Sequence, residues 1–149
     1  MSILSILKDC LITRVKNSAS AGTTDQDSTV LDMSGYDGVL FAWLLGDATS
    51  GSVLELQVFG NTASSTSSPT PVELTVDDVT YTAGASDADN KVMVVDCIRP
   101  AYRYVFARGV IDTQNCVSDG MLAIQYRARN RPVTQGSTLL DFALIGPFV

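Results

Sequence analysis

Two acidic stretches contain the residue types from which a metal site or a hydrolytic site could be built. The stretch Asp87-Ala-Asp-Asn90 matches the start of a calcium loop, because carboxylates two residues apart can converge on one hard cation. Where such a loop needs a glycine and a bidentate glutamate, however, the sequence has Val92 and Ile98. Asp77 and Asp78 could supply one of the two carboxyl groups that glycoside hydrolysis requires. A polar turn between strands is the alternative interpretation of both stretches.

Nucleophilic and cofactor-dependent chemistry lacks its usual residues. The chain has no histidine, so imidazole bases, His-containing triads and His-ligated zinc sites are excluded. There is also no G-x-S-x-G elbow and no glycine-rich phosphate loop. We therefore expect a protein that is not an enzyme and has no catalytic residues, metal or cofactor. The three cysteines, Cys10, Cys97 and Cys116, cannot all pair within the chain, which favours synthesis in a reducing compartment.

Charge is distributed unevenly along the sequence. The net charge is −6, yet residues 17–98 hold twelve acids and one base, whereas residues 99–131 hold six arginines and two acids. An acidic chain is poorly suited to nucleic acid, so we expect no nucleic-acid partner. The arginines either pair with acids of their own fold or line a face that meets a partner protein. The arginines taken as candidate interface residues are Arg99, Arg103, Arg127, Arg129 and Arg131.

The elements that must position these residues are mostly strands. Alternating or continuous apolar runs predict about eight of them, at 11–16, 39–45, 53–59, 72–76, 79–82, 91–98, 104–111 and 122–128. The run 39–45 is apolar at both parities, so we expect a central strand covered on both sides, with Trp43 in the core rather than on a sugar-stacking surface. Turn signals separate the runs, and no helical crossovers intervene. The sequence therefore predicts an all-β fold, a two-sheet antiparallel sandwich of the jelly-roll type.

The 149 residues predict one domain, 1–149, with an N-terminal arm (1–9) that starts a short helical turn and an extended C-terminal tail (133–149). The Ser/Thr-rich stretch 61–71 reads as a polar loop. Both ends are apolar, so they either complete this chain's own core or lie on a neighbouring subunit. The candidate contact residues there are Ile3, Leu4, Leu7, Phe142, Ile145 and Phe148. We expect no signal peptide, because residues 1–9 have no basic n-region and soon reach Lys8 and Asp9. We expect no membrane partner, since no apolar run approaches the roughly 20 residues of a membrane span.

Three segments considered together resemble a known family. They are 32–41 (DMSGYDGVLF), 86–96 (SDADNKVMVVD) leading into 99–105 (RPAYRYV), and 119–129 (DGMLAIQYRAR). Their order and spacing, over residues 30–131, resemble the head decoration (cement) proteins of tailed bacteriophages, which have jelly-roll folds. The resemblance implies a structural virion protein that binds between major capsid protein subunits and stabilises the shell. It also implies self-association as a dimer or trimer, synthesis in the bacterial cytoplasm and a place on the outer surface of the capsid.

On this hypothesis the apolar ends clamp neighbouring subunits, the arginine segment meets an acidic capsid surface, and the acidic remainder faces outward. Two other classes of function stay open. A carbohydrate- or receptor-binding β-sandwich module would expose aromatic side chains over a concave sheet face, and a head–tail or tail subunit would assemble as a ring. A glycosidase would depend on Asp77 and Asp78.

Overall fold

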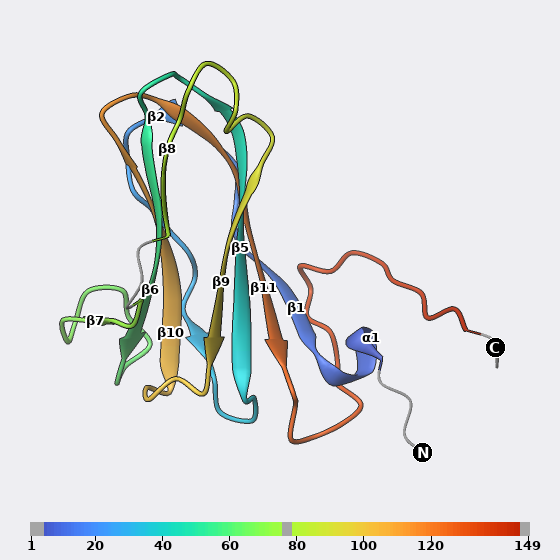
Figure 1. Ribbon diagram of the computed structural model, residues 1–149. Helices are drawn as coiled ribbons and strands as arrows, with labels where there is room; N and C mark the ends of the chain where they lie inside the picture. The colour runs from blue at the N-terminus through green and yellow to red at the C-terminus, as the bar shows by residue number, and fades with distance from the viewer. Residues whose placement is uncertain (1–4, 76–78, 147–149) are drawn as a thin grey trace.

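Two antiparallel β-sheets packed face to face form the body of the protein (Figure 1). The computed structural model describes residues 5–75 and 79–146 of the 149-residue chain. The elements in these ranges are α1 (Ile6–Asp9), β1 (Leu11–Lys16), β2 (Ala19–Gly22), β3 (Gln26–Asp27), β4 (Leu31–Asp32), β5 (Gly38–Ala48), β6 (Val53–Asn61), β7 (Val72–Glu73), β8 (Thr80–Thr82), β9 (Val92–Ile98), β10 (Tyr104–Asp112) and β11 (Cys116–Tyr126). The predicted all-β, two-sheet antiparallel sandwich is confirmed.

The strand order identifies the type of sandwich. β1 and β2 both pair with β11, β3 and β4 both pair with β10, and β7 and β8 both pair with β6. If each of these pairs is counted as one interrupted strand, the eleven described strands become eight. The two sheets then have the orders 1-8-3-6 and 2-7-4-5. This is the order of a jelly roll, so the predicted jelly roll is confirmed as well.

The core lies between the sheets and is built from alternate residues of the long strands. On β6, Leu54, Leu56 and Val58 are buried, while Glu55 and Gln57 between them are only half-buried, as the alternation predicted. Apolar side chains of β5, β10 and β11 point into the same layer. The hydrophobic stabilisation of the fold is therefore concentrated in the four longest strands.

Trp43 occupies the centre of this core, which confirms its predicted position. Its side chain is fully buried, and its indole N–H donates to Ser118 Oγ at 2.9 Å. The ring packs over Gly109 on β10, where an added Cβ would lie 2.8 Å from two ring atoms. Glycine at this position therefore makes room for the largest side chain of the core.

The expectation that 39–45 is covered on both sides is wrong. Val39, Phe41, Trp43 and Leu45 are buried, but the alternate residues of β5 are only half-buried. They lie on the outer face of the sheet, which no other element of the described chain covers (Figure 1). Apolar residues at both parities here reflect an uncovered apolar sheet face rather than a strand between two layers.

Several strand boundaries also differ from the predictions. The short strands β2, β3 and β4 were missed, because runs of 4, 2 and 2 residues are too short to show alternation, although Gln26 on β3 and Leu31 on β4 are buried. The expected strand at 72–76 ends at Glu73, and residues 76–78, including the acidic pair Asp77–Asp78, lie outside the described residues. The expected strand at 122–128 begins earlier, at Cys116, and ends at Tyr126, because Arg127 has a left-handed backbone with φ +53°.

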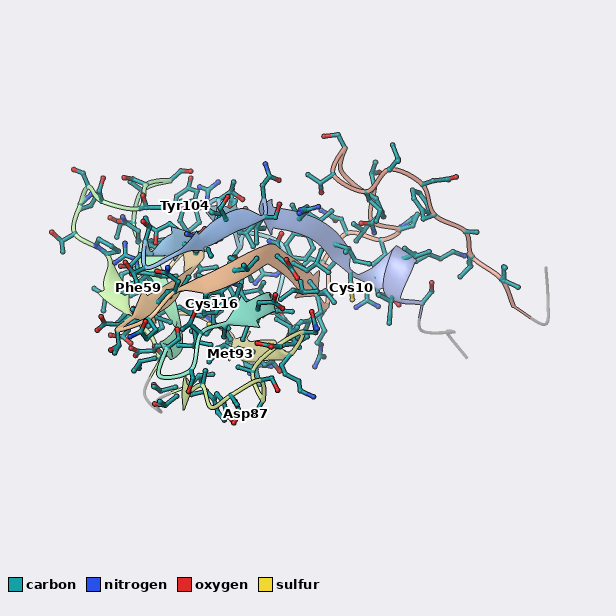
Figure 2. All side chains as sticks on the ribbon, turned by 90° about the horizontal axis from the view of Figure 1, so that it is seen from above. Cys10, Phe59, Asp87, Met93, Tyr104 and Cys116 are labelled. Atoms are coloured by element: carbon teal, nitrogen blue, oxygen red, sulfur yellow. The ribbon has the colours of Figure 1, made fainter. Side chains whose placement is uncertain are left out.

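The two ends of the described chain run together beside β1. α1 is the expected short helical turn, and the Gln135 side chain amide donates to the Leu7 and Cys10 carbonyls. Gln135 Oε1 in turn accepts from Ile12 N–H, and Thr138 Oγ1 accepts from Arg14 N–H. Figure 2 shows α1 and the tail together beyond the end of β1, outside the two sheets.

After Thr138 the tail leaves the body. Leu140, Phe142 and Ile145 are 98%, 56% and 89% exposed, so the interpretation that the tail completes this chain's own core is wrong. The tail itself extends away from the two sheets (Figure 1). In the described ranges there is no helix with the length and apolar character needed to cross a membrane.

Candidate functional site

Three loops meet at one end of the sandwich, at the bottom of Figure 1. They are the β4–β5 loop (33–37), the β9–β10 loop (99–103) and the segment after β11 (127–131). The first residue of β5 pairs with the last residue of β11 on one side and with the last residue of β9 on the other. The residues that follow, Arg127 and Arg99, therefore lie on either side of Asp37.

Five of the predicted interface residues gather here, and we call this surface the arginine end: Arg99, Arg103, Arg127, Arg129 and Arg131. They line two adjoining shallow hollows that share Asp37 and Arg129. All five side chains are exposed. Guanidinium groups gathered in this way can bind carboxylates with two parallel hydrogen bonds each.

Three of the five arginines have an acidic partner. Arg103 binds both carboxylate oxygens of Asp32, at 3.0 Å from Nε and 2.9 Å from Nη2. This contact, with a further hydrogen bond from the Ser34 N–H, holds the pKa of Asp32 well below its usual range. The other two pairs are longer and are those of Arg127 Nε with Asp37 Oδ2 at 3.4 Å and of Arg131 Nε with Asp9 Oδ1 at 3.5 Å.

Arg99 and Arg129 have no acidic partner in residues 5–75 and 79–146. Their backbones are nevertheless fixed, since Arg99 N–H donates to Asp37 O at 2.7 Å and Arg129 N–H donates to Gly35 O at 2.9 Å. The guanidinium groups of Arg99 and Arg129 are thus exposed to solvent, while hydrogen bonds hold their backbones in place. They are the groups of the arginine end that are free to bind an anionic partner.

The backbone of this end is strained at two positions. Arg99 has φ +49° and Arg127 has φ +53°, in the left-handed region that favours glycine. These residues directly follow the last residues of β9 and β11, and the turn they make ends both strands. Non-glycine residues in such conformations are often found at functional sites, where the surrounding structure holds them.

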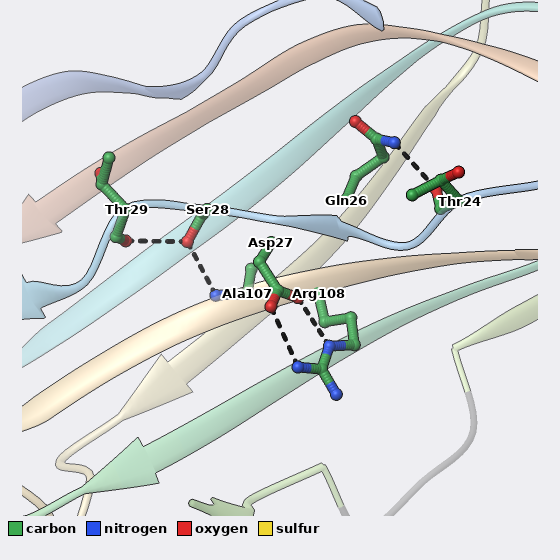
Figure 3. A network of polar contacts seen from close by, with 7 residues as sticks. All are labelled: Thr24, Gln26, Asp27, Ser28, Thr29, Ala107 and Arg108. Atoms are coloured by element: carbon green, nitrogen blue, oxygen red, sulfur yellow. Dashed lines mark hydrogen bonds and ion pairs between the residues drawn. The ribbon is translucent and has the colours of Figure 1, made fainter. Parts of the chain in front are cut away.

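The sixth arginine of the basic segment, Arg108, lies elsewhere. It points outward from β10 and forms two hydrogen bonds with Asp27 on β3, at 2.6 and 3.0 Å (Figure 3). Its guanidinium also lies 5.0 Å from the centre of the Phe59 ring. Arg108 is therefore an arginine that pairs within its own fold, whereas Arg99 and Arg129 are not.

The acidic stretch 87–90 forms a hydrogen-bonded turn. Tyr81 Oη donates to Asp87 Oδ2 at 2.7 Å, Gly84 N–H donates to Asp87 Oδ1, and Asp89 Oδ1 accepts from Ala48 N–H at 2.8 Å. The Tyr81 contact lowers the pKa of Asp87. Among the described side chains, no group of three or more His, Cys, Asp or Glu residues converges as a metal site would require.

The predicted apolar contact residues are not part of the arginine end. Leu7 is half-buried in α1, and Phe142 and Ile145 lie on the tail. Ile3, Leu4 and Phe148 lie outside the described residues.

The sequence did not reveal that Asp9, Asp32 and Asp37 would be the partners of the arginines, because strand pairing brings them there from distant parts of the chain. Comparison of the sequence with protein-family models finds no match, and comparison with curated proteins finds no similar sequence.

Proposed function

We propose that the protein decorates and stabilises a bacteriophage capsid by binding between subunits of the major capsid protein. The observation that carries the proposal is the arginine end, which places five exposed arginines together on a chain of net charge −6. Arginine is the charged residue that is enriched at protein interfaces and that matches carboxylates geometrically. The arginine end is therefore suited to an acidic protein surface, while the acidic remainder keeps decorated particles apart by charge repulsion.

The strength of such a contact can be bounded. Exposed ion pairs contribute about 0.2–1 kcal/mol each, so Arg99 and Arg129, which have no acidic partner in the described structure, give about 0.4–2 kcal/mol, which is weaker than millimolar affinity. The arginine end alone would orient a copy on the shell without holding it firmly. Firm decoration requires additional contacts, either from the exposed apolar tail or from several linked copies that bind at once.

Decoration stabilises a capsid by mass action. A protein that binds the expanded shell, and not the form before expansion, shifts the equilibrium toward the expanded shell in proportion to its affinity and concentration. This role requires a stable fold and complementary surfaces only. The jelly roll with its arginine end and exposed tail supplies both.

The first experiment is the copy number of this chain in gradient-purified phage particles, measured by quantitative mass spectrometry against the major capsid protein. A ratio near one, or a simple fraction such as one third, is the expected result for decoration of the whole shell. A handful of copies per particle would instead indicate a head–tail or tail subunit. Complete absence from the particles would reject the virion proposal and leave a carbohydrate- or receptor-binding module.

A second experiment tests the arginine end directly. Arg99→Glu combined with Arg129→Glu reverses the two charges that lack an acidic partner in the described structure. Co-sedimentation with undecorated shells should show binding at least tenfold weaker, which corresponds to about 1.4 kcal/mol. The matched control is Arg14→Glu, an exposed arginine on β1 away from this end. Equal binding by the folded double variant and the control would contradict the proposed role of the arginine end.

A further inference from the structure

One edge of the sheet formed by β1, β11, β5 and β9 has backbone groups available for pairing. β9 pairs with β5 and with no other strand of the described chain. At its two ends, Lys91 O accepts from Leu45 N–H and Arg99 N–H donates to Asp37 O, so residues 91 and 99 direct their backbone groups toward β5. Successive residues of a strand point their backbone N–H and C=O groups alternately to its two sides. The groups of residues 92, 94, 96 and 98 therefore point to the free edge.

Three of the four outward side chains at this edge are apolar, and the fourth, Asp96, accepts a hydrogen bond from Tyr126 Oη at 2.7 Å. Val92, Val94 and Ile98 are 53%, 45% and 67% exposed on the outer face of the sheet. Their neighbours on β5 continue the apolar surface, because Val92 lies opposite Leu44 and Val94 lies opposite Ala42. An exposed apolar edge strand of this kind is a template for pairing with another chain.

The opposite edge of the same sheet is protected. On β1, Ile12 N–H donates to Gln135 Oε1 at 3.0 Å and Arg14 N–H donates to Thr138 Oγ1 at 3.1 Å. The chain therefore uses side chains of its own tail to satisfy backbone donors at one edge. In residues 5–75 and 79–146 no such cover lies on β9.

The tail beyond Thr138 has the alternating apolar pattern of a β-strand, but it pairs with no strand of the described chain. Leu140, Phe142 and Leu144 alternate with Asp141 and Ala143, so in an extended chain the three large apolar side chains lie on one face. Leu140, Phe142 and Leu144 are 98%, 56% and 43% exposed. The segment 139–145 has the same length as β9, which has 7 residues.

We propose that residues 139–145 of one copy pair as an added strand with the free edge of β9 in a second copy. The pairing gives partners to the outward backbone groups of β9 and places Leu140, Phe142 and Leu144 beside Val92, Val94 and Ile98. The same β9 edge also borders a groove that is lined largely by apolar residues, Val58, Leu74, Val79, Val95 and Cys97, together with Thr75 and Asp96. The alternate residues of the added strand, Asp141, Ala143 and Ile145, lie toward this groove. Backbone hydrogen bonds and apolar contacts then support each other in one interface.

The geometry favours a second copy over the tail's own sheet. The tail leaves the body beside β1, and β9 lies at the far edge of that sheet (Figure 1). A tail that returned to its own β9 would have to cross the apolar sheet face, where its backbone N–H and C=O groups would have no partners. Between copies, the contact is either exchanged reciprocally in a dimer or passed head to tail around a ring. The inference goes beyond the proposed function, because it requires no capsid.

The test compares the full chain with two variants that each lack one side of the contact. One variant ends at Thr138, and the other is Val94→Lys, which places a charge on the β9 edge. Light scattering after size exclusion should give the full chain a mass that is a multiple of 15.9 kDa and give each variant the mass of a single chain. Thr82→Lys, with the same charge on edge strand β8 of the other sheet, is the matched control and should behave as the full chain does.

Mixing the two variants provides the decisive measurement. The chain that ends at Thr138 keeps β9, and the Val94→Lys chain keeps its tail, so together they should form a complex of one chain each. Circular dichroism confirms that both are folded, and Val92→Lys replaces Val94→Lys if the latter unfolds. A full chain that is monomeric at every concentration, a variant that remains oligomeric, or a mixture without a complex would each overturn the inference.

Discussion

Replacement of Arg99 by glycine relieves the backbone strain at the arginine end, and its effect can be distinguished from the loss of the positive charge. At a φ of +49°, a residue with a Cβ destabilises the fold by roughly 1–2 kcal/mol, whereas glycine does not. Glycine in turn loses roughly 0.5–1 kcal/mol more conformational entropy on folding. The Arg99 side chain has no ion pair in the described structure that would offset the gain. Arg99→Gly should therefore raise the free energy of unfolding by about 0.7 kcal/mol.

For a chain of this length, 1 kcal/mol shifts the Tm by about 2–4 °C, so Arg99→Gly should raise it by about 2 °C in a calorimetric scan. Arg99→Ala is the matched control, because it removes the same charge and keeps the Cβ. The alanine variant should show no rise in Tm, and both variants should lose the same amount of binding to shells. An equal rise for alanine, or a lower Tm for glycine, would refute the assignment of strain to this position.

Three further outcomes follow from single contacts. Gly109→Ala should destabilise the fold by about 1–3 kcal/mol in urea unfolding, because the new methyl group would lie 2.8 Å from the Trp43 ring. The Arg103 guanidinium lowers the pKa of Asp32, so the pair stabilises the fold above the ordinary Asp pKa of about 4 and this stabilisation is lost as the pH falls. The thermal stabilities of the wild type and Asp32→Asn, about 1 kcal/mol apart at most, should therefore converge below that pH. Burial raises the pKa of the Cys116 thiol to about 11, so iodoacetamide at pH 8 should label it only after denaturation, as peptide mass spectrometry would show.

The parts of the fold that sequence reasoning predicted are those with a local cause. The alternation in β6 and the position of Trp43 in the core follow from the polarity of neighbouring residues, and both are confirmed. Residue polarity also led to the wrong expectation that the outer face of β5 is covered by a second layer. Polarity shows that Leu40, Ala42 and Leu44 are apolar, but it does not show whether another layer covers them.

The sequence predicted which arginines make up the candidate site, but it did not predict which of them pair with acidic residues. The concentration of arginines after residue 98 is visible in the sequence, but which of them find partners depends on strand register. Asp32 reaches Arg103 because β4 pairs with the start of β10, and Asp37 lies between two arginines because β5 is central in its sheet. The left-handed backbone at Arg99 and Arg127 has no sequence signal, since glycine is the residue expected there.

The position of β11 has a consequence for synthesis on the ribosome. β11 is the last strand in the described part of the chain, yet it lies in the middle of its sheet, between β5 and β1, the first described strand. Until β11 has been made, the long apolar strand β5 has an unpaired edge and β1 has no strand to pair with. This sheet therefore forms late and from distant parts of the chain, which makes folding slow and exposes the unfinished chain to aggregation. A ribosome that stalls before β11 is complete would release a product that cannot fold.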